Sequence, residues 1–169
     1  NDKDKMKQRP KNEIWNYQQI DLGFNYRMND IQAALGLNQM KRLDKYIKFR
    51  HKIAKNYNIS LNNLSLITPW QSPKSYSSYH LYPILVKKNL DNKSQKQVYR
   101  ELMKNNIAAN LHYIPVHRHP YYENLGFKKN DFPISENFHQ EAISIPMYAK
   151  LKEEHQKYVI DILKKINSR

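Results

Sequence analysis

Asn25 and Arg27 are the first residues whose types and spacing suit a chemical task. They stand just before a predicted helix, which Asn29 caps and Gln32 supports by completing a capping box. An amide and a guanidinium at a helix start can bind an anion such as a phosphate, because the first backbone N–H groups of a helix also attract negative charge. The same two side chains can instead fill a turn and carry a solvated charge, and their spacing leaves both interpretations open.

The loop that contains His112, His117 and His119 is the second candidate, since it brings three imidazoles close together in sequence. Three histidines can suggest zinc. Within this cluster, however, there is no cysteine or carboxylate, and Pro115 and Pro120 restrict the backbone, so we expect no metal site. A loop that hydrogen-bonds a polar ligand through histidine and tyrosine and an ordinary surface loop both remain open as alternatives.

The composition narrows the classes of function. Lysine and arginine number 29 against 15 aspartates and glutamates, and the net charge of +14 suits acidic partners such as nucleic acid. The lysines are spread along the chain and no nucleic-acid module signature accompanies them, so we do not expect a nucleic-acid partner. The chain has no cysteine and three glycines, which excludes disulfides and a glycine-rich phosphate loop. Without a membrane span or signal peptide in the sequence, we expect a cytoplasmic protein with no membrane partner.

One long helix is predicted to precede the rest of the fold. Residues 1–22 lack sustained periodicity and indicate a loop, and the start of the chain without a methionine indicates a cut inside a longer chain. From residue 29 to about residue 57 the apolar residues follow helical spacing, with a bend near 48–52 where they thin out. We therefore divide the chain into a loop at 1–28, a connecting helix at 29–58 and a small domain at 59–169.

The small domain is predicted to be α+β, with a short, mostly antiparallel sheet and helices on one face. Pro83 places the second strand at an edge or in a bulge. Ser94 and Gln97 form a capping box at a helix start, and Ser135 is predicted to cap a helix that includes Ala142. In chain order, the predicted elements are strands at 64–68 and 79–87, a helix after 94, a strand at 107–114, a helix after 135 and a last helix at 151–166.

Four stretches of the chain resemble, in the same order, segments of the DegT/DnrJ/EryC1/StrS family. They are Gln19–Gly36, Ser77–Tyr82, His112–His117 and Ile145–Tyr148, and the resemblance covers nearly the whole chain from Trp15 onward. Members of this family are pyridoxal-phosphate-dependent sugar aminotransferases of fold type I. The resemblance implies that the chain is the small carboxy-terminal domain of such an enzyme, with 1–28 as the remnant of its large cofactor domain.

The resemblance also implies roles for individual residues. Asn25 matches the family's asparagine that reaches across a homodimer interface to the cofactor phosphate of the neighbouring subunit, and Arg27 lies near the same shared site. The loop from His112 onward most resembles the branch that aminates a UDP-linked 4-keto-6-deoxy-N-acetyl-hexosamine in pseudaminic acid synthesis, with glutamate as amino donor. The residues expected to border the nucleotide-sugar pocket are His112, Tyr113, Ile114, Pro115 and His117.

One part of the family pattern is missing from these residues. The family's Schiff-base lysine lies upstream of the matched segments, in a serine-rich setting that none of the lysines here shares, so no catalytic residue is assigned. A transamination by the usual covalent route needs that lysine. We therefore expect this chain to be inactive by itself. The alternatives are a non-catalytic binding module that keeps the family fold and, less favoured, a basic nucleic-acid-binding domain.

Overall fold

The computed structural model describes residues 23–24, 26–87 and 93–167, and the chain forms two compact units, Asn1–Lys41 and Arg42–Arg169. The described part of the first unit contains the helix α1 (Asp30–Met40). Asn29 caps it as predicted: the Gln32 backbone N–H donates to Asn29 Oδ1 at 2.9 Å, and the Asn29 N–H donates to Gln32 Oε1 at 3.1 Å. No residue of α1 is buried. The capping box and the backbone ladder therefore define this helix, without support from a core.

The helical stretch after Asn29 is two helices rather than one. A turn at Lys41–Arg42 separates α1 from α2 (Leu43–Leu61). The predicted single helix over 29–58 is therefore wrong in its continuity, and the predicted bend at 48–52 is wrong because α2 is unbroken there. Apolar spacing indicated helix on both sides of the turn, but lysine and arginine are good helix formers and gave no sign of a break.

The second unit is built on a three-stranded antiparallel sheet with the order β1-β2-β3. The strands are β1 (Leu66–Ile67), β2 (Tyr82–Val86) and β3 (Ala142–Ile145). Pro83 pairs with Ser144 of β3, whereas β1 reaches only as far as Leu85 and Val86. The strand β2 is therefore central, and the predicted edge position is wrong for the strand as a whole. Pro83 nevertheless has no partner on the β1 side, which explains why a residue without an N–H is tolerated there.

The third strand comes from a part of the chain predicted to be helical. Residues 107–114 contribute only an isolated bridge, Asn110 to Ser144, and not the predicted strand. The helix α5 (Pro133–Glu141) begins with Pro133 at its first turn, so the predicted cap at Ser135 is wrong, and Ala142 belongs to β3. All four residues of β3 are buried. Four buried residues in succession suit a strand covered on both faces, a pattern that local periodicity does not separate from a buried helix.

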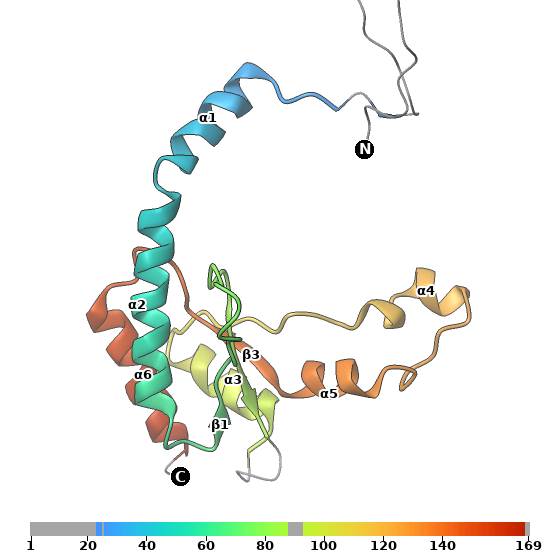
Figure 1. The fold of residues 1–169 in the computed structure, drawn as a ribbon. Helices are drawn as coiled ribbons and strands as arrows, with labels where there is room; N and C mark the ends of the chain where they lie inside the picture. Colours follow the sequence, from blue (N-terminus) through green and yellow to red (C-terminus); the bar gives the residue numbers. More distant parts are fainter. Residues whose placement is uncertain (1–22, 25, 88–92, 168–169) are drawn as a thin grey trace, which may run out of the picture. The chain divides into compact units, whose positions relative to one another are not determined.

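Helices cover the face of β2 that carries its most buried side chains, as predicted. Tyr82 and Ile84 are fully buried, and the Tyr82 ring lies 5.0 Å from the Tyr57 ring of α2. The capping box at Ser94 is present and starts α3 (Gln95–Lys104), and the last helix is α6 (Glu153–Asn167). Both α2 and α3 pack against α6 (Figure 1). None of the helices in the described part of the chain has the length and apolar content that a membrane span requires.

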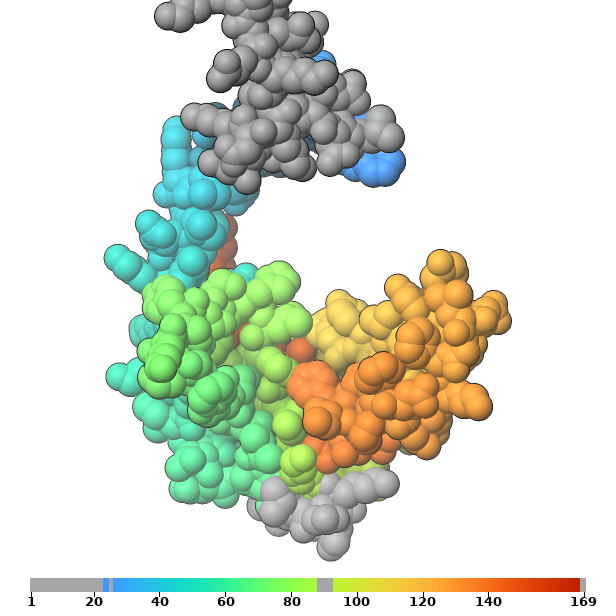
Figure 2. All heavy atoms as spheres, turned by 45° about the vertical axis from the view of Figure 1, so that its right-hand side comes forward, coloured from blue at the N-terminus to red at the C-terminus, as the bar shows by residue number. Residues whose placement is uncertain are grey.

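A projecting arm completes the second unit. It consists of the 3₁₀ helix η2 (Val116–Arg118), the short helix α4 (Pro120–Asn124) and α5, and it extends away from the sheet (Figure 1). In the space-filling view the arm is yellow to orange and stands opposite the green residues around β1 and β2 (Figure 2). The arm thus carries the histidine-rich loop away from the main core.

Candidate functional site

A cavity of about 560 Å³ lies beside β3 and contains one of the predicted ligand-binding residues, His112. Its apolar lining includes Ile107, Met147 and Val159. The polar groups that line it are Asn106, Asn110, His112, Ser144, Tyr148, His155 and Tyr158. Such a cavity can bind a ligand that has both an apolar face and several hydrogen-bonding groups.

His112 is held in this cavity by β3. The backbones of Asn110 and Ser144 exchange two hydrogen bonds, at 3.0 and 2.8 Å, which fixes the segment before His112. The Nδ1 atom of His112 then lies 2.9 Å from the Ser144 hydroxyl oxygen. Among the described residues, Nε2 of His112 has no hydrogen-bond partner, so this nitrogen is the one that can reach a ligand.

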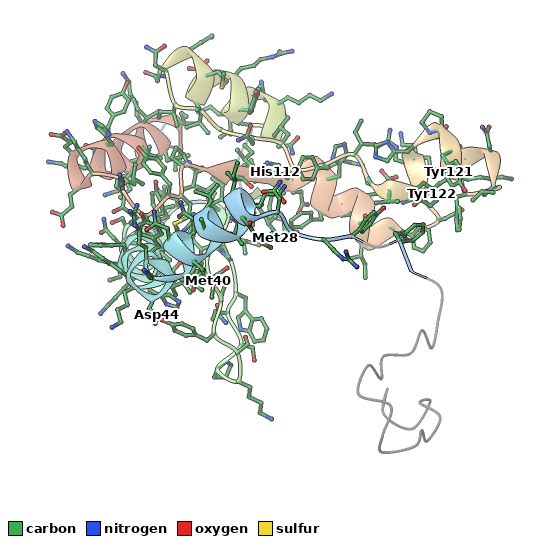
Figure 3. The ribbon with its side chains drawn as sticks, turned by 90° about the horizontal axis from the view of Figure 1, so that it is seen from above. Met28, Met40, Asp44, His112, Tyr121 and Tyr122 are labelled. Carbon is green, nitrogen blue, oxygen red and sulfur yellow. The ribbon has the colours of Figure 1, made fainter. Side chains whose placement is uncertain are left out.

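The other predicted pocket residues do not line the same cavity. Tyr113 is 72% exposed and Ile114 52% exposed, whereas Pro115 and His117 are buried within the arm. In Figure 3, His112 lies at the base of the arm, while Tyr121 and Tyr122 lie at its far end. The loop that the sequence presented as one group therefore has three parts: a cavity residue, an exposed pair and a buried anchor.

The buried part of the loop is held by a hydrogen-bonded cluster around Glu136 of α5. Its Oε1 atom lies 3.0 Å from Nε2 of His117, and its Oε2 atom accepts from Nη1 of Arg118 at 3.3 Å. The Phe132 ring packs against the His117 ring at 4.9 Å between centroids. The His117 imidazole is thus occupied within the arm, and its effect on a ligand would act through the shape of the loop.

The histidines of this loop do not converge. His112 bonds to Ser144 and His117 to Glu136, which belong to different elements. The described residues contain no group of three or more histidines, cysteines, aspartates or glutamates placed to hold a metal ion.

The predicted anion-binding pair lies in the first unit. Asn25 falls outside the described residues. Arg27 is exposed and precedes the cap of α1 by two positions. The rings of Phe24 and Tyr26 stack at 5.4 Å between their centroids. The assignment of Asn25 and Arg27 to a cofactor phosphate stays a prediction.

Sequence reasoning missed Ser144 and Glu136, which position the two histidines of the loop. Ser144 lies 32 residues from His112, and Glu136 lies 19 residues from His117. The segment His112–His119 itself contains no carboxylate. The only signal for Glu136 in the sequence was that it is a carboxylate in a predicted helix after a histidine-rich loop. Such an arrangement is too common to identify one residue.

Comparison with known proteins gives a consistent result. The model of the DegT/DnrJ/EryC1/StrS aminotransferase family matches residues 3–164. The chain is 38% identical over 156 residues to an uncharacterised protein of Methanocaldococcus jannaschii, which covers 91% of this chain and 40% of that protein. It is 33% identical over 149 residues to the UDP-4-amino-4,6-dideoxy-N-acetyl-beta-L-altrosamine transaminase of Helicobacter pylori, covering 87% of this chain and 39% of the relative.

A solved structure agrees with the sequence comparison. The PLP form of the putative sugar aminotransferase Spr1654 from Streptococcus pneumoniae superposes with a TM-score of 0.78 at 28% identity, and the match covers 91% of this chain and 39% of that one. The chain therefore spans about two fifths of the length of the relatives it matches.

Proposed function

Because this chain belongs to the DegT/DnrJ/EryC1/StrS aminotransferase family and shares the fold of its fold type I members, we propose that it is the carboxy-terminal portion of a pyridoxal-phosphate-dependent nucleotide-sugar aminotransferase. The reaction transfers an amino group from glutamate to C4 of a UDP-linked 4-keto-6-deoxy-N-acetyl-hexosamine, as in pseudaminic acid biosynthesis. The observation that carries this proposal is the match of 87% of the chain to the Helicobacter pylori altrosamine transaminase. The working enzyme is a cytoplasmic homodimer.

Asn25 and Arg27 are the residues of this chain that would hold the phosphate of the cofactor. The exposed Arg27 side chain lies two positions before the cap of α1, and a planar guanidinium fits a phosphate in a bidentate way. The residue types of this pair, an amide and a guanidinium, therefore fit the anionic end of pyridoxal phosphate. When bound, the cofactor supplies the aldehyde and electron-withdrawing ring that carry an amino group between two substrates.

The histidine-rich loop would bind the nucleotide sugar. His112 offers Nε2 to a polar atom of the ligand, because Nδ1 is engaged by Ser144. Tyr113 and Ile114 present exposed surface next to it, and Pro115 and His117 hold the backbone of the loop in the arm. This division assigns direct contact to the first three residues and positioning to the last two.

Cofactor retention tests the role of the turn before α1. In the protein made from the complete reading frame, Asn25→Ala and Arg27→Ala are expected to weaken retention of pyridoxal phosphate during dialysis by about tenfold or more, since each removes a phosphate ligand. Lys41→Ala removes one positive charge from the same unit and is the matched control. Unchanged affinity in the Asn25 and Arg27 variants would remove these residues from the cofactor site.

Substrate kinetics test the role of His112 in the same full-length protein. His112→Ala is expected to raise KM for the nucleotide sugar by about tenfold, through loss of one or more hydrogen bonds to the ligand, while the half-reaction with glutamate is unaffected. His119→Ala, an exposed histidine of the same loop, is the control. An equal effect on both half-reactions would indicate a structural role for His112. A full-length protein that retains cofactor but transfers no amino group to any keto sugar would favour the non-catalytic alternative.

The 169-residue chain alone is expected to form no stoichiometric adduct with pyridoxal phosphate. Borohydride reduction followed by peptide mass spectrometry would detect such an adduct at a lysine. A single lysine labelled to completion would contradict the assignment of the Schiff-base lysine to another segment.

A further inference from the structure

A groove lies between α2 and α6, separate from the cavity that holds His112. Its volume is about 1330 Å³, and it shares only Leu151 with the cavity beside β3. The two helices pack side by side (Figure 1). The groove is lined along α2 from Lys45 to Ser60 and along the other wall from Ala149 to Lys164. None of the roles proposed above uses it.

A buried glutamine fixes the two walls of the groove relative to each other. Gln156 of α6 is 3% exposed, and its Nε2 donates to the backbone carbonyl of Ile53 at 2.8 Å. Its Oε1 accepts from Nδ2 of Asn56 at 2.9 Å. Lys52 and Glu153 form an ion pair at 2.6 Å across the same pair of helices. Because the polar atoms of Gln156 are satisfied on both sides, the groove has a defined width before any ligand arrives.

The rim of the groove is strongly cationic. Eight of its twenty lining residues are lysine or arginine and two are acidic, whereas lysine and arginine make up 29 of the 169 residues of the chain. One of the two acids, Glu153, is paired with Lys52. Five of the lining lysines have no salt bridge to any residue in the described part of the chain, since the other two, Lys52 and Lys152, pair with Glu153 and Glu154. The five are Lys45, Lys55, Lys150, Lys157 and Lys164. The excess of positive charge is therefore concentrated here beyond the general bias of the sequence.

Exposed apolar side chains accompany these cations. Ile59 is 68% exposed and Phe49 is 44% exposed, although both line the groove. The Nζ atom of Lys45 lies 6.0 Å from the centre of the Phe49 ring. We call Phe49 and Ile59 the apolar strip. Together with the lysines of the rim, this strip is complementary to a ligand that has an apolar face flanked by acids.

We propose that the groove between α2 and α6 docks an acidic amphipathic helix of a partner protein. The apolar face of that helix covers Phe49 and Ile59, and its carboxylates meet the lysines of the rim. A nucleic-acid backbone would pair with the lysines but would leave the apolar strip uncovered. A bilayer surface is flat on this scale and does not enter a groove between two packed helices.

The test uses the 169-residue chain and a fluorescein-labelled synthetic helix of about 18 residues, which matches the length of α2. The probe carries leucines along one face and glutamates along the other, and a second peptide has the same composition with the leucines scattered. Fluorescence anisotropy at low and high salt measures binding. Binding of the amphipathic probe at least about tenfold tighter than that of the scattered one is expected.

Two sets of charge reversals separate the groove from general surface charge. The triple variant Lys55→Glu, Lys157→Glu and Lys164→Glu is expected to weaken binding by at least about tenfold. The matched control, Lys74→Glu, Lys96→Glu and Lys129→Glu, changes the net charge equally at exposed positions away from the groove and is expected to weaken it by less than about threefold. Circular dichroism establishes that each variant is folded. Should the groove triple fail to fold, the single variants Lys157→Glu and Ile59→Ser give the readout, each with a loss of about threefold or more.

Several results would overturn the proposal. Equal losses in the groove triple and its control would assign the binding to general charge, and equal binding of both peptides would show that the apolar strip is not used. If the amphipathic probe shows no measurable binding, the proposal is wrong. Phosphatidylserine vesicles and a single-stranded oligothymidine are tested in the same way. If either binds more tightly than the helix, and the triple variant of the groove loses that binding, the partner belongs to a different class.

Discussion

The Nε2 atom of His117 lies 3.0 Å from the Oε1 atom of Glu136, and both side chains are buried. This contact joins η2 to α5, and together with Arg118 it forms a polar cluster within the arm. Three aromatic rings of the arm also pack in succession, with Phe127 between Tyr122 and Phe132. We therefore expect the stability of the arm, and with it the course of the loop from His112 to His117, to depend on the Glu136 carboxylate.

Removal of that carboxylate is expected to destabilise the fold. Glu136→Ala leaves His117 without its buried hydrogen-bond partner, and the free energy of unfolding should fall by about 2 kcal/mol. Glu136→Gln keeps one oxygen acceptor and should cost less. Urea denaturation of the 169-residue chain, followed by circular dichroism, measures both. The exposed Glu123 of the same arm is the control, with a change within about 0.5 kcal/mol for Glu123→Ala; an equal loss in both variants would contradict the role of Glu136.

The two capping boxes should respond differently to the same substitution. Ser94 caps α3, which buries Val98 and Leu102, so Ser94→Ala should lower the free energy of unfolding by about 1 kcal/mol. Asn29 caps α1, which buries nothing, so Asn29→Ala should reduce the helicity of α1 and leave the unfolding free energy unchanged. Backbone chemical shifts of α1 and urea denaturation give the two readouts. Asn29→Asp keeps a capping oxygen and should retain the helix; a helicity that survives in Asn29→Ala would argue against dependence on the cap.

The buried tyrosines Tyr57 and Tyr82 predict a loss of stability in alkali. Burial raises the pKa of both hydroxyls well above the usual value of 10.0, and neighbouring tyrosines raise it further. Tyr57 donates to the carbonyl of Pro146 at 3.0 Å, and Tyr82 donates to Asn58. The unfolded chain releases these protons near pH 10 while the folded chain keeps them, so this contribution is complete below that pH and falls as the pH rises above it.

Urea denaturation at a series of pH values above and below 10 measures this effect. Tyr57→Phe removes a hydrogen bond and should lower stability at neutral pH, but its free energy of unfolding should decline less steeply above pH 10 than that of the parent chain. The lysines titrate in the same range, but they are the same in both chains, so their contribution cancels when one stability curve is subtracted from the other. Parallel curves would show that Tyr57 does not keep its proton through this range.

Arg50 and His51 of α2 should hold the segment before β2 in place. The Nη1 atom of Arg50 donates to the carbonyls of Tyr79 and His80 at 2.7 and 2.9 Å, and Nε2 of His51 lies 2.8 Å from the Ser77 carbonyl oxygen. Arg50→Ala should raise amide hydrogen exchange in residues 77–81, with a loss of about 1–3 kcal/mol in the local opening free energy. Lys48→Ala, exposed on the same helix, is the control. If hydrogen exchange is unchanged in Arg50→Ala, the rings around His51, and not Arg50, hold this segment in place.

Much of the helical structure could be predicted from the sequence because its causes are local. The boxes at Asn29 and Ser94 were identified from residues three positions apart, and the periodicity of the last helix predicted α6. The resemblance of Gln19–Gly36 and three later segments identified the family and, through it, the fold. The turn at Lys41–Arg42 was missed because neither residue disfavours a helix.

The site was only partly predictable. The sequence presented His112 to His117 as one ligand-binding loop, and the structure places His112 in a cavity while it buries His117 in the arm. Predicting this division required knowing that Ser144 would lie beside His112 and Glu136 beside His117. It also required the identity of the third strand, Ala142–Ile145, which carries Ser144.

The sequence by itself therefore determined the starts of α1 and α3, the helical period of α6 and the family motifs, since these depend on residues close together along the chain. Only the tertiary structure decided which strand completes the sheet, which partner each histidine receives, and that cationic residues of α2 and α6 line one groove. The physical reason is the same in each case. A hydrogen bond or a shared surface between residues 19, 32 or 100 positions apart depends on the path of the whole chain, which no local pattern specifies.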